Sequence, residues 1–154
     1  MSELKLGQSR EYLDKKAREE NLVVFLPQPN EVFLDVDLPF MLDWEPGYVL
    51  DYINNSMCME VLSTLVTRSK SGNKHIYMRF SRDLSDLERV IFQVCLGSDS
   101  VKELFSFIQL KLIAHLTEFT CECPVALFET ASQAAEVNAW REREQKKITA
   151  GTGG

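Results

Sequence analysis

The chain has no hydrophobic run long enough to cross a membrane. A transmembrane helix needs roughly 18 to 20 consecutive apolar residues, and no stretch of the sequence reaches that length. The first ten residues are polar and do not resemble a secretion signal. We therefore expect a cytoplasmic protein without a membrane partner.

Cysteine is too sparse for a disulfide scaffold. The four cysteines lie at positions 58, 95, 121 and 123, without the density or regular spacing of a small secreted domain. Cys121 and Cys123 could form half of a zinc site, but no Cys-x-x-Cys pair or paired histidine lies nearby to complete it. We expect reduced thiols and no structural zinc.

Positive charge is also in short supply. The formal net charge is −6, which weighs against a protein whose whole surface holds nucleic acid. Five basic side chains fall within one stretch of fifteen residues, Arg68, Lys70, Lys74, Arg79 and Arg82. Any contact with nucleic acid must therefore be local, and the alternative is a solvated hairpin.

Length and composition indicate a single globular core. The chain has 154 residues, of which 45% are hydrophobic and 26% are charged, as is usual for one domain. We expect an α+β domain over residues 1–129, a polar helix over 130–150 and a disordered Gly-rich tail over 151–154. No internal repeat is visible.

Hydrophobic periodicity predicts short strands interspersed with helices. Strands are expected over residues 22–26, 32–38, 57–67, 75–80 and 124–129, and helices over 9–21, 48–55, 131–147, from Ser85 to Gly97, and after Ser98 or Asp99. This order is too irregular for a doubly wound parallel sheet. It favours a mostly antiparallel, RRM-like sheet with helices packed on one face.

The strand expected over residues 32–38 carries two aspartates on one face. Alternation places Asp35 and Asp37 together with Phe33. Neighbouring carboxylates repel one another, and a divalent cation such as Mg²⁺ or Mn²⁺ removes that cost because it prefers oxygen ligands. The pair predicts a metal site, and the alternative is an exposed strand end with solvated charges.

Two later segments could complete such a site. The turn over residues 69–73 offers small side chains and backbone donors just before His75 and Tyr77, which suits a phosphate. Asp99 follows Gly97 at a helix boundary, where helix N-termini also favour anions. On the alternative interpretation, Asp99 is an ordinary N-cap.

These three segments, in this order, resemble the three motifs of archaeo-eukaryotic primase-polymerases. The resemblance covers roughly residues 31–105. It implies that Asp35 and Asp37 bind catalytic Mg²⁺ or Mn²⁺, that His75 contacts the phosphates of the incoming nucleotide, and that Asp99 completes the metal site.

The same resemblance suggests further nucleotide contacts. Ser71 and Gly72 would shape the nucleotide pocket, and Lys70, Lys74 and Arg79 would neutralise phosphate charge. The implied partners are a nucleoside triphosphate, single-stranded or primed nucleic acid and a replication protein. The implied activity is a metal-dependent nucleotidyl transfer in DNA replication or repair, in a compact and phage-encoded relative of the family.

Two other hypotheses remain open. A primase-like domain could bind nucleotides or template DNA without synthesis and act as an adaptor in a replication complex. Alternatively, the domain could be purely structural, with Asp35, Asp37 and Asp99 as surface carboxylates and His75 as an ordinary strand histidine.

Overall fold

A computed structural model describes residues 10–36, 47–98, 107 and 126–151 of the chain. Asp37 and Asp99, like the helix expected after Ser98, lie outside these residues. The elements of the described part are α1 (Arg10–Glu20), β1 (Val23–Phe25), β2 (Glu31–Val36), α2 (Gly47–Met57), β3 (Val61–Arg68), β4 (Lys74–Phe80), α3 (Asp86–Cys95), β5 (Leu127–Glu129) and α5 (Ala131–Gly151). None of these helices is long and apolar enough to cross a membrane.

The described strands form two antiparallel sheets. The larger has the order β2-β4-β3, and the smaller pairs β1 with β5. In the larger sheet Phe33 stands opposite Tyr77, and Asp35 stands opposite His75. The expected α+β class and antiparallel pairing are confirmed.

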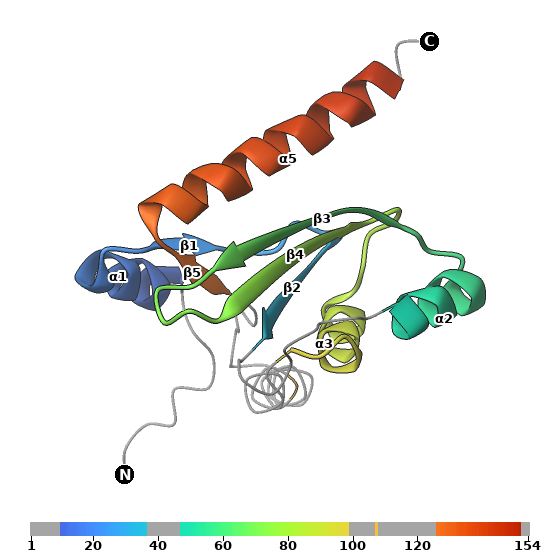
Figure 1. Ribbon diagram of the computed structural model, residues 1–154, viewed down its shortest axis with the longest axis horizontal. Coiled ribbons are helices and arrows are strands. Elements are labelled where there is room, and N and C mark those ends of the chain that lie inside the picture. The colour runs from blue at the N-terminus through green and yellow to red at the C-terminus, as the bar shows by residue number, and fades with distance from the viewer. Residues whose placement is uncertain (1–9, 37–46, 99–106, 108–125, 152–154) are drawn as a thin grey trace.

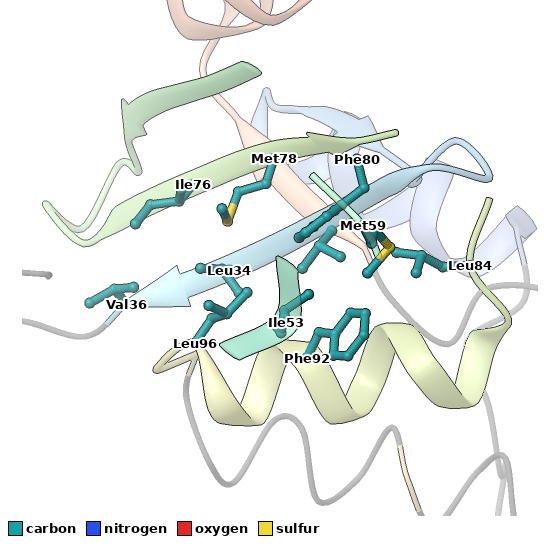
Figure 2. Close-up of a cluster of buried hydrophobic side chains, with 11 residues drawn as sticks. Leu34, Val36, Ile53, Met59, Ile76, Met78, Phe80, Leu84, Phe92 and Leu96 are labelled. Atoms are coloured by element: carbon teal, nitrogen blue, oxygen red, sulfur yellow. The ribbon is translucent and has the colours of Figure 1, made fainter. Parts of the chain in front are cut away.

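One face of the larger sheet carries the main hydrophobic core. Alternation along β2 and β4 turns Val32, Leu34, Ile76 and Met78 to the same face, and each of them is fully buried. Side chains from α2 and α3 pack against this face, including Ile53, Phe92 and Leu96. Figure 2 shows α3 running beneath the strands with Phe92 pointing up into this layer.

Helices cover both faces of the sheet, not one face as expected. In Figure 1, α5 lies on the side of the sheet opposite to α2 and α3. The reason is that β2 and β4 also place large aromatic residues, Phe33 and Tyr77, on the second face. These pack in one cluster with Val137 and Trp140 of the largely polar helix α5.

An ion pair further ties α5 to the sheet. Arg141 donates to both carboxylate oxygens of Glu31, with N–O distances of 2.7 and 3.2 Å. Glu31 is fully buried at the start of β2. Because the pair is bidentate and partly desolvated, it has a fixed geometry as well as charge complementarity.

Local capping fixes both ends of α3. Ser85 and Glu88 form a capping box, and the start of this helix expected at Ser85 is confirmed. At its other end Gly97 has a φ of 94°, and Ser98 N–H donates to Gln93 O while Gly97 N–H donates to Val94 O. This is a Schellman ending, which requires a left-handed residue and therefore favours glycine.

The capping box predicts an acid-dependent contribution to stability. The hydrogen bond from Arg82, assisted by the backbone N–H of Ser85, lowers the pKa of Glu88 from 4.5 to about 2. A carboxyl whose pKa is depressed on folding stabilises the protein above its unfolded pKa, and this effect is lost as the pH falls toward the folded value.

We expect Glu88→Gln to lower the free energy of unfolding at pH 7 by no more than about 1 kcal/mol, because solvent screens this exposed pair. The difference from the parent protein should shrink between about pH 4.5 and pH 2. Urea unfolding at both ends of this range measures it. A difference that stays constant across the range would contradict the assignment.

Candidate functional site

A pocket of about 360 Å³ opens where the end of β2, the turn between β3 and β4, and β5 meet. Asp35, Lys70, Ser71 and His75 contribute to its polar lining, and Leu22, Leu127 and Phe128 contribute apolar surface. Four of the side chains predicted from the sequence therefore line one cavity, although they come from segments more than thirty residues apart.

The turn between β3 and β4 is held together by its own hydrogen bonds. Ser69 N–H donates to Asn73 O at 2.8 Å, and Gly72 N–H donates to Ser69 O at 2.9 Å. Asn73 N–H donates to the Ser69 hydroxyl at 3.1 Å. Gly72 has a φ of 93°, a conformation that other residues adopt only with strain. Because these amides are used inside the turn, the side chains of Lys70 and Ser71 are the groups we expect to contact a ligand.

Asp35 and His75 are paired across the adjacent strands β2 and β4. They occupy opposite positions in the β2–β4 register, and His75 Nε2 lies 3.7 Å from Asp35 Oδ1. His75 is 5% exposed. Antiparallel partners point to the same side of a sheet, so Asp35 and His75 share one face.

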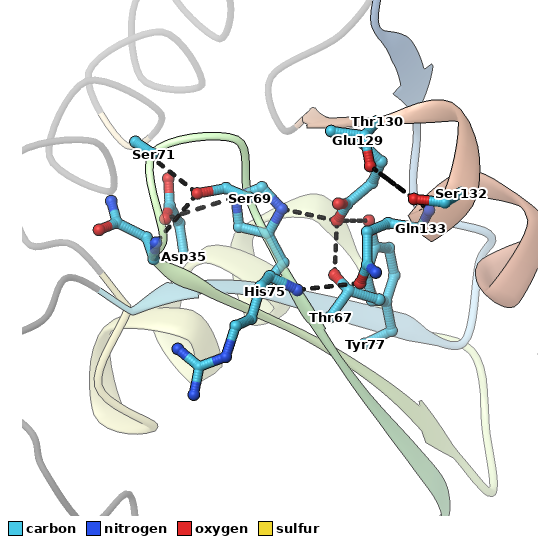
Figure 3. Close-up of polar contacts among 12 residues, drawn as sticks. Asp35, Thr67, Ser69, Ser71, His75, Tyr77, Glu129, Thr130, Ser132 and Gln133 are labelled. Atoms are coloured by element: carbon cyan, nitrogen blue, oxygen red, sulfur yellow. Dashed lines mark hydrogen bonds and ion pairs between the residues drawn. The ribbon is translucent and has the colours of Figure 1, made fainter.

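On its other side His75 contacts Glu129 of β5. Figure 3 shows the Glu129 carboxylate among side chains of β3 and β4. Its Oε1 atom lies 2.6 Å from His75 Nδ1 and also accepts hydrogen bonds from the hydroxyls of Thr67 at 2.7 Å and Tyr77 at 2.6 Å. Glu129 is fully buried. This carboxylate therefore links the smaller sheet to the larger one directly behind the pocket.

The Tyr77 hydroxyl remains a proton donor in this network. Burial raises the pKa of Tyr77 far above its usual range, and the adjacent Glu129 carboxylate raises it further. Both effects disfavour a phenolate, since a second negative charge would lie in a poorly solvated site.

Ser98 joins the end of α3 to the pocket. The backbone N–H of Asp35 donates to the Ser98 hydroxyl at 3.0 Å. Ser98 is held there by the Schellman ending, and it is the residue that precedes Asp99 in the sequence. The last described residue of the Gly-Ser-Asp segment therefore contacts the Asp-x-Asp strand.

The remaining predicted residues lie elsewhere or outside the described part. Arg79 is 2% exposed, and its guanidinium lies 5.7 Å from the centre of the Trp140 ring and donates to Gln28 at 2.5 Å. It is therefore buried under α5, away from the pocket lining. Lys74 is partly buried and is also absent from that lining.

Of the expected metal site, Asp35 lies in the described part of the chain, whereas Asp37 and Asp99 do not. Among the described residues, no group of three or more His, Cys, Asp or Glu side chains is arranged to hold a metal ion. Of the three expected ligands, Asp35 alone is described, and its side chain is 22% exposed at the pocket. A carboxylate there has the hard oxygen chemistry that Mg²⁺ or Mn²⁺ requires.

Sequence reasoning did not single out Glu129 or Ser98. Glu129 ends a short apolar run, Val125 to Phe128, much as Asp35 follows an apolar run. That similarity is the one signal that could have marked it, since a charged residue within an apolar strand needs a partner when it is buried.

Comparisons of the chain with protein-family models, with curated proteins and with solved structures found no match. The resemblance to primase-polymerases therefore rests on the motifs within this sequence.

The Glu129 network predicts a measurable cost for losing one donor. Tyr77→Phe keeps the aromatic packing but removes a hydrogen bond to a buried carboxylate. We expect it to lower the free energy of unfolding by about 1.5–3 kcal/mol, the range for hydrogen bonds to charged groups. Tyr52→Phe is the matched control, because Tyr52 is 68% exposed. Equal effects of the two substitutions in urea unfolding would show that the Tyr77–Glu129 bond contributes nothing.

Proposed function

We propose that the pocket binds the phosphates of a nucleoside triphosphate and that the domain is a metal-dependent nucleotidyltransferase of the primase-polymerase type. The supporting observation is that described parts of all three motif segments meet. Asp35 stands opposite His75 in the sheet, and Ser98 binds the Asp35 backbone. In an arbitrary set of surface carboxylates, no such convergence is expected.

The chemistry of the lining suits a triphosphate. Lys70 supplies an exposed positive charge and Ser71 a hydroxyl at the pocket rim, and the imidazole of His75 lies within the lining. Asp35, Asp37 and Asp99 would hold Mg²⁺ or Mn²⁺. Such ions, when bound, neutralise phosphate charge and lower the pKa of a coordinated hydroxyl. On this proposal, the chain's own residues orient the triphosphate, with Lys70 on its oxygens and His75 beside them.

The proposal includes partners and a location. Single-stranded or primed nucleic acid would supply the acceptor hydroxyl, and a replication protein would supply template-binding surface, because the net charge of −6 leaves little basic surface of its own. We place the protein in the cytoplasm, or in the host cytoplasm if it is phage-encoded.

One observation favours a second candidate, a nucleotide-binding adaptor without synthesis. Of the three cations expected beside the phosphates, Lys70 lines the pocket whereas Arg79 is buried beneath α5. Phosphoryl-transfer catalysis depends on positive groups around the transferring phosphate. A site with fewer of them would bind a nucleotide more readily than it would accelerate transfer.

Nucleotide incorporation distinguishes the two candidates. We expect the parent protein to extend primed or single-stranded DNA in the presence of Mn²⁺. Asp35→Asn should reduce the rate by at least about 100-fold, because it removes charge from the centre of the site. Asp51→Asn, at an exposed position of α2, should leave the rate unchanged.

Three outcomes of the incorporation and binding measurements bear on the proposal. Incorporation that survives in the Asp35 variant would rule out this pocket as the catalytic site. Calorimetric binding of ATP with Mn²⁺ but no incorporation would favour the adaptor. The absence of both incorporation and binding would refute the proposal.

A further inference from the structure

The contact between Glu129 and His75 suggests a role that the motif resemblance does not include. His75 has a carboxylate near each ring nitrogen: Glu129 Oε1 lies 2.6 Å from Nδ1, and Asp35 Oδ1 lies 3.7 Å from Nε2. Asp35 lines the pocket, whereas Glu129 is fully buried. The imidazole therefore connects a buried carboxylate with the candidate site.

We infer that Glu129 is a positioning residue that keeps the His75 Nδ1 atom protonated and turns Nε2 toward Asp35 and the pocket. The part of this inference that concerns nucleotide binding rests on the proposed function. The orientation of His75 does not, because it follows from the contacts within the described chain.

The short Nδ1–Oε1 distance determines where the ring proton lies. An ionised carboxylate can only accept hydrogen bonds. If Nδ1 were unprotonated, its lone pair would face a negatively charged oxygen only 2.6 Å away. A proton on Nδ1 converts this repulsion into a charge-assisted hydrogen bond, which is among the stronger bonds in proteins.

Two hydroxyls prevent the carboxylate from turning away. Thr67 and Tyr77 donate to the same Oε1 atom that contacts His75. Thr67 lies on β3 and Tyr77 on β4, so the oxygen is held from two strands. Its partner oxygen Oε2 is buried and has no hydrogen-bond partner among the described residues. The carboxylate therefore has one well-determined orientation, and that orientation fixes the imidazole.

A positioned imidazole has a direct consequence for ligand binding. A functional histidine commonly has its second nitrogen held by a carboxylate, which selects the tautomer and the ring orientation. Without Glu129, the ring could exchange its two tautomers, and its Nε2 atom would no longer be held toward Asp35 and the pocket. The cost would appear as weaker binding of a ligand in the pocket.

Side-chain NMR of the full-length protein tests the orientation without assuming any function. The chain has two histidines, so long-range ¹H–¹⁵N spectra of the parent protein and of His115→Gln assign the His75 signals. We expect a protonated Nδ1 with a strongly downfield proton. In Glu129→Gln that downfield signal should disappear, because a neutral amide can either accept from or donate to Nδ1.

Calorimetry with ATP and Mg²⁺ adds the functional readout. Glu129→Gln should weaken ATP binding by about 10- to 100-fold, the usual effect of removing the partner of a functional histidine. Thr67→Val is the matched control. It removes another hydrogen bond to Glu129 Oε1 but leaves the Glu129–His75 contact, so the NMR signal and the ATP affinity should both persist.

The NMR and calorimetric results together decide whether Glu129 positions His75. An unprotonated Nδ1 in the parent protein, or a downfield signal that persists in Glu129→Gln, overturns the inference even if that variant is unstable. Equal loss of ATP affinity in the Glu129 and Thr67 variants also overturns it, since the effect would then be general destabilisation. If the NMR results are as expected but no protein binds ATP, the proposed function fails and the positioning of His75 stands.

Discussion

The fold depends most on one buried carboxylate, Glu129 of the smaller sheet, whose hydrogen-bond partners lie in the larger sheet. Removing Glu129 from water costs several kcal/mol unless polar groups replace the lost hydration. Its partners Thr67, His75 and Tyr77 all belong to the larger sheet, while Glu129 itself belongs to β5. The β1-β5 sheet can therefore pack against the larger sheet in only one position if this carboxylate is to be paired. The same position closes the wall of the pocket, which Leu127, Phe128 and His75 line together.

A second buried carboxylate, Glu31, lies at the start of β2 in the larger sheet. Glu31 accepts from Arg141 of α5 and from the backbone N–H of Gln28 at 2.8 Å. Arg89 of α3, itself 5% exposed, donates to the carbonyl oxygens of Glu31, Gln28 and Pro29. Helices from both sides of the sheet thus bind the segment that leads into β2. This segment positions the strand that carries Asp35, so the site rests on rigid elements and not on loops alone.

Local patterns predicted the elements better than their assembly. Every described strand overlaps an expected one, because alternation and turn residues are local signals. The N-cap signal at Ser85 is likewise local, and the expected start of α3 was confirmed. The pairing of β1 with β5 was not predicted, since Val23 and Glu129 are more than one hundred residues apart and no periodicity encodes such a contact. The docking of α5 was missed because only a few residues of this polar helix, chiefly Val137 and Trp140, form its buried stripe.

In the candidate site, too, local patterns were predictable from the sequence and long-range contacts were not. Alternation along β4 puts His75, Tyr77 and Arg79 on one face, but a local pattern could not show that α5 covers the Arg79 end and leaves the His75 end at a pocket. Glu129 was missed because its role arises only when β5 packs across β4. The motif order did anticipate that Asp35 and His75 would be neighbours, and the register of β2 and β4 agrees. Burial, which depends on the whole fold, thus decides which side chains of a polar face remain accessible to a ligand.

The most direct test of the central claim, that this pocket binds a nucleoside triphosphate, is a titration of the ¹⁵N-labelled protein with ATP and Mg²⁺ followed by backbone amide NMR. The account predicts saturable shifts concentrated at Asp35, at His75, at Ser98 and in the turn over residues 69–73, with the exposed outer part of α5 unaffected. Shifts confined to other surfaces, or no shifts at millimolar ATP, would contradict it.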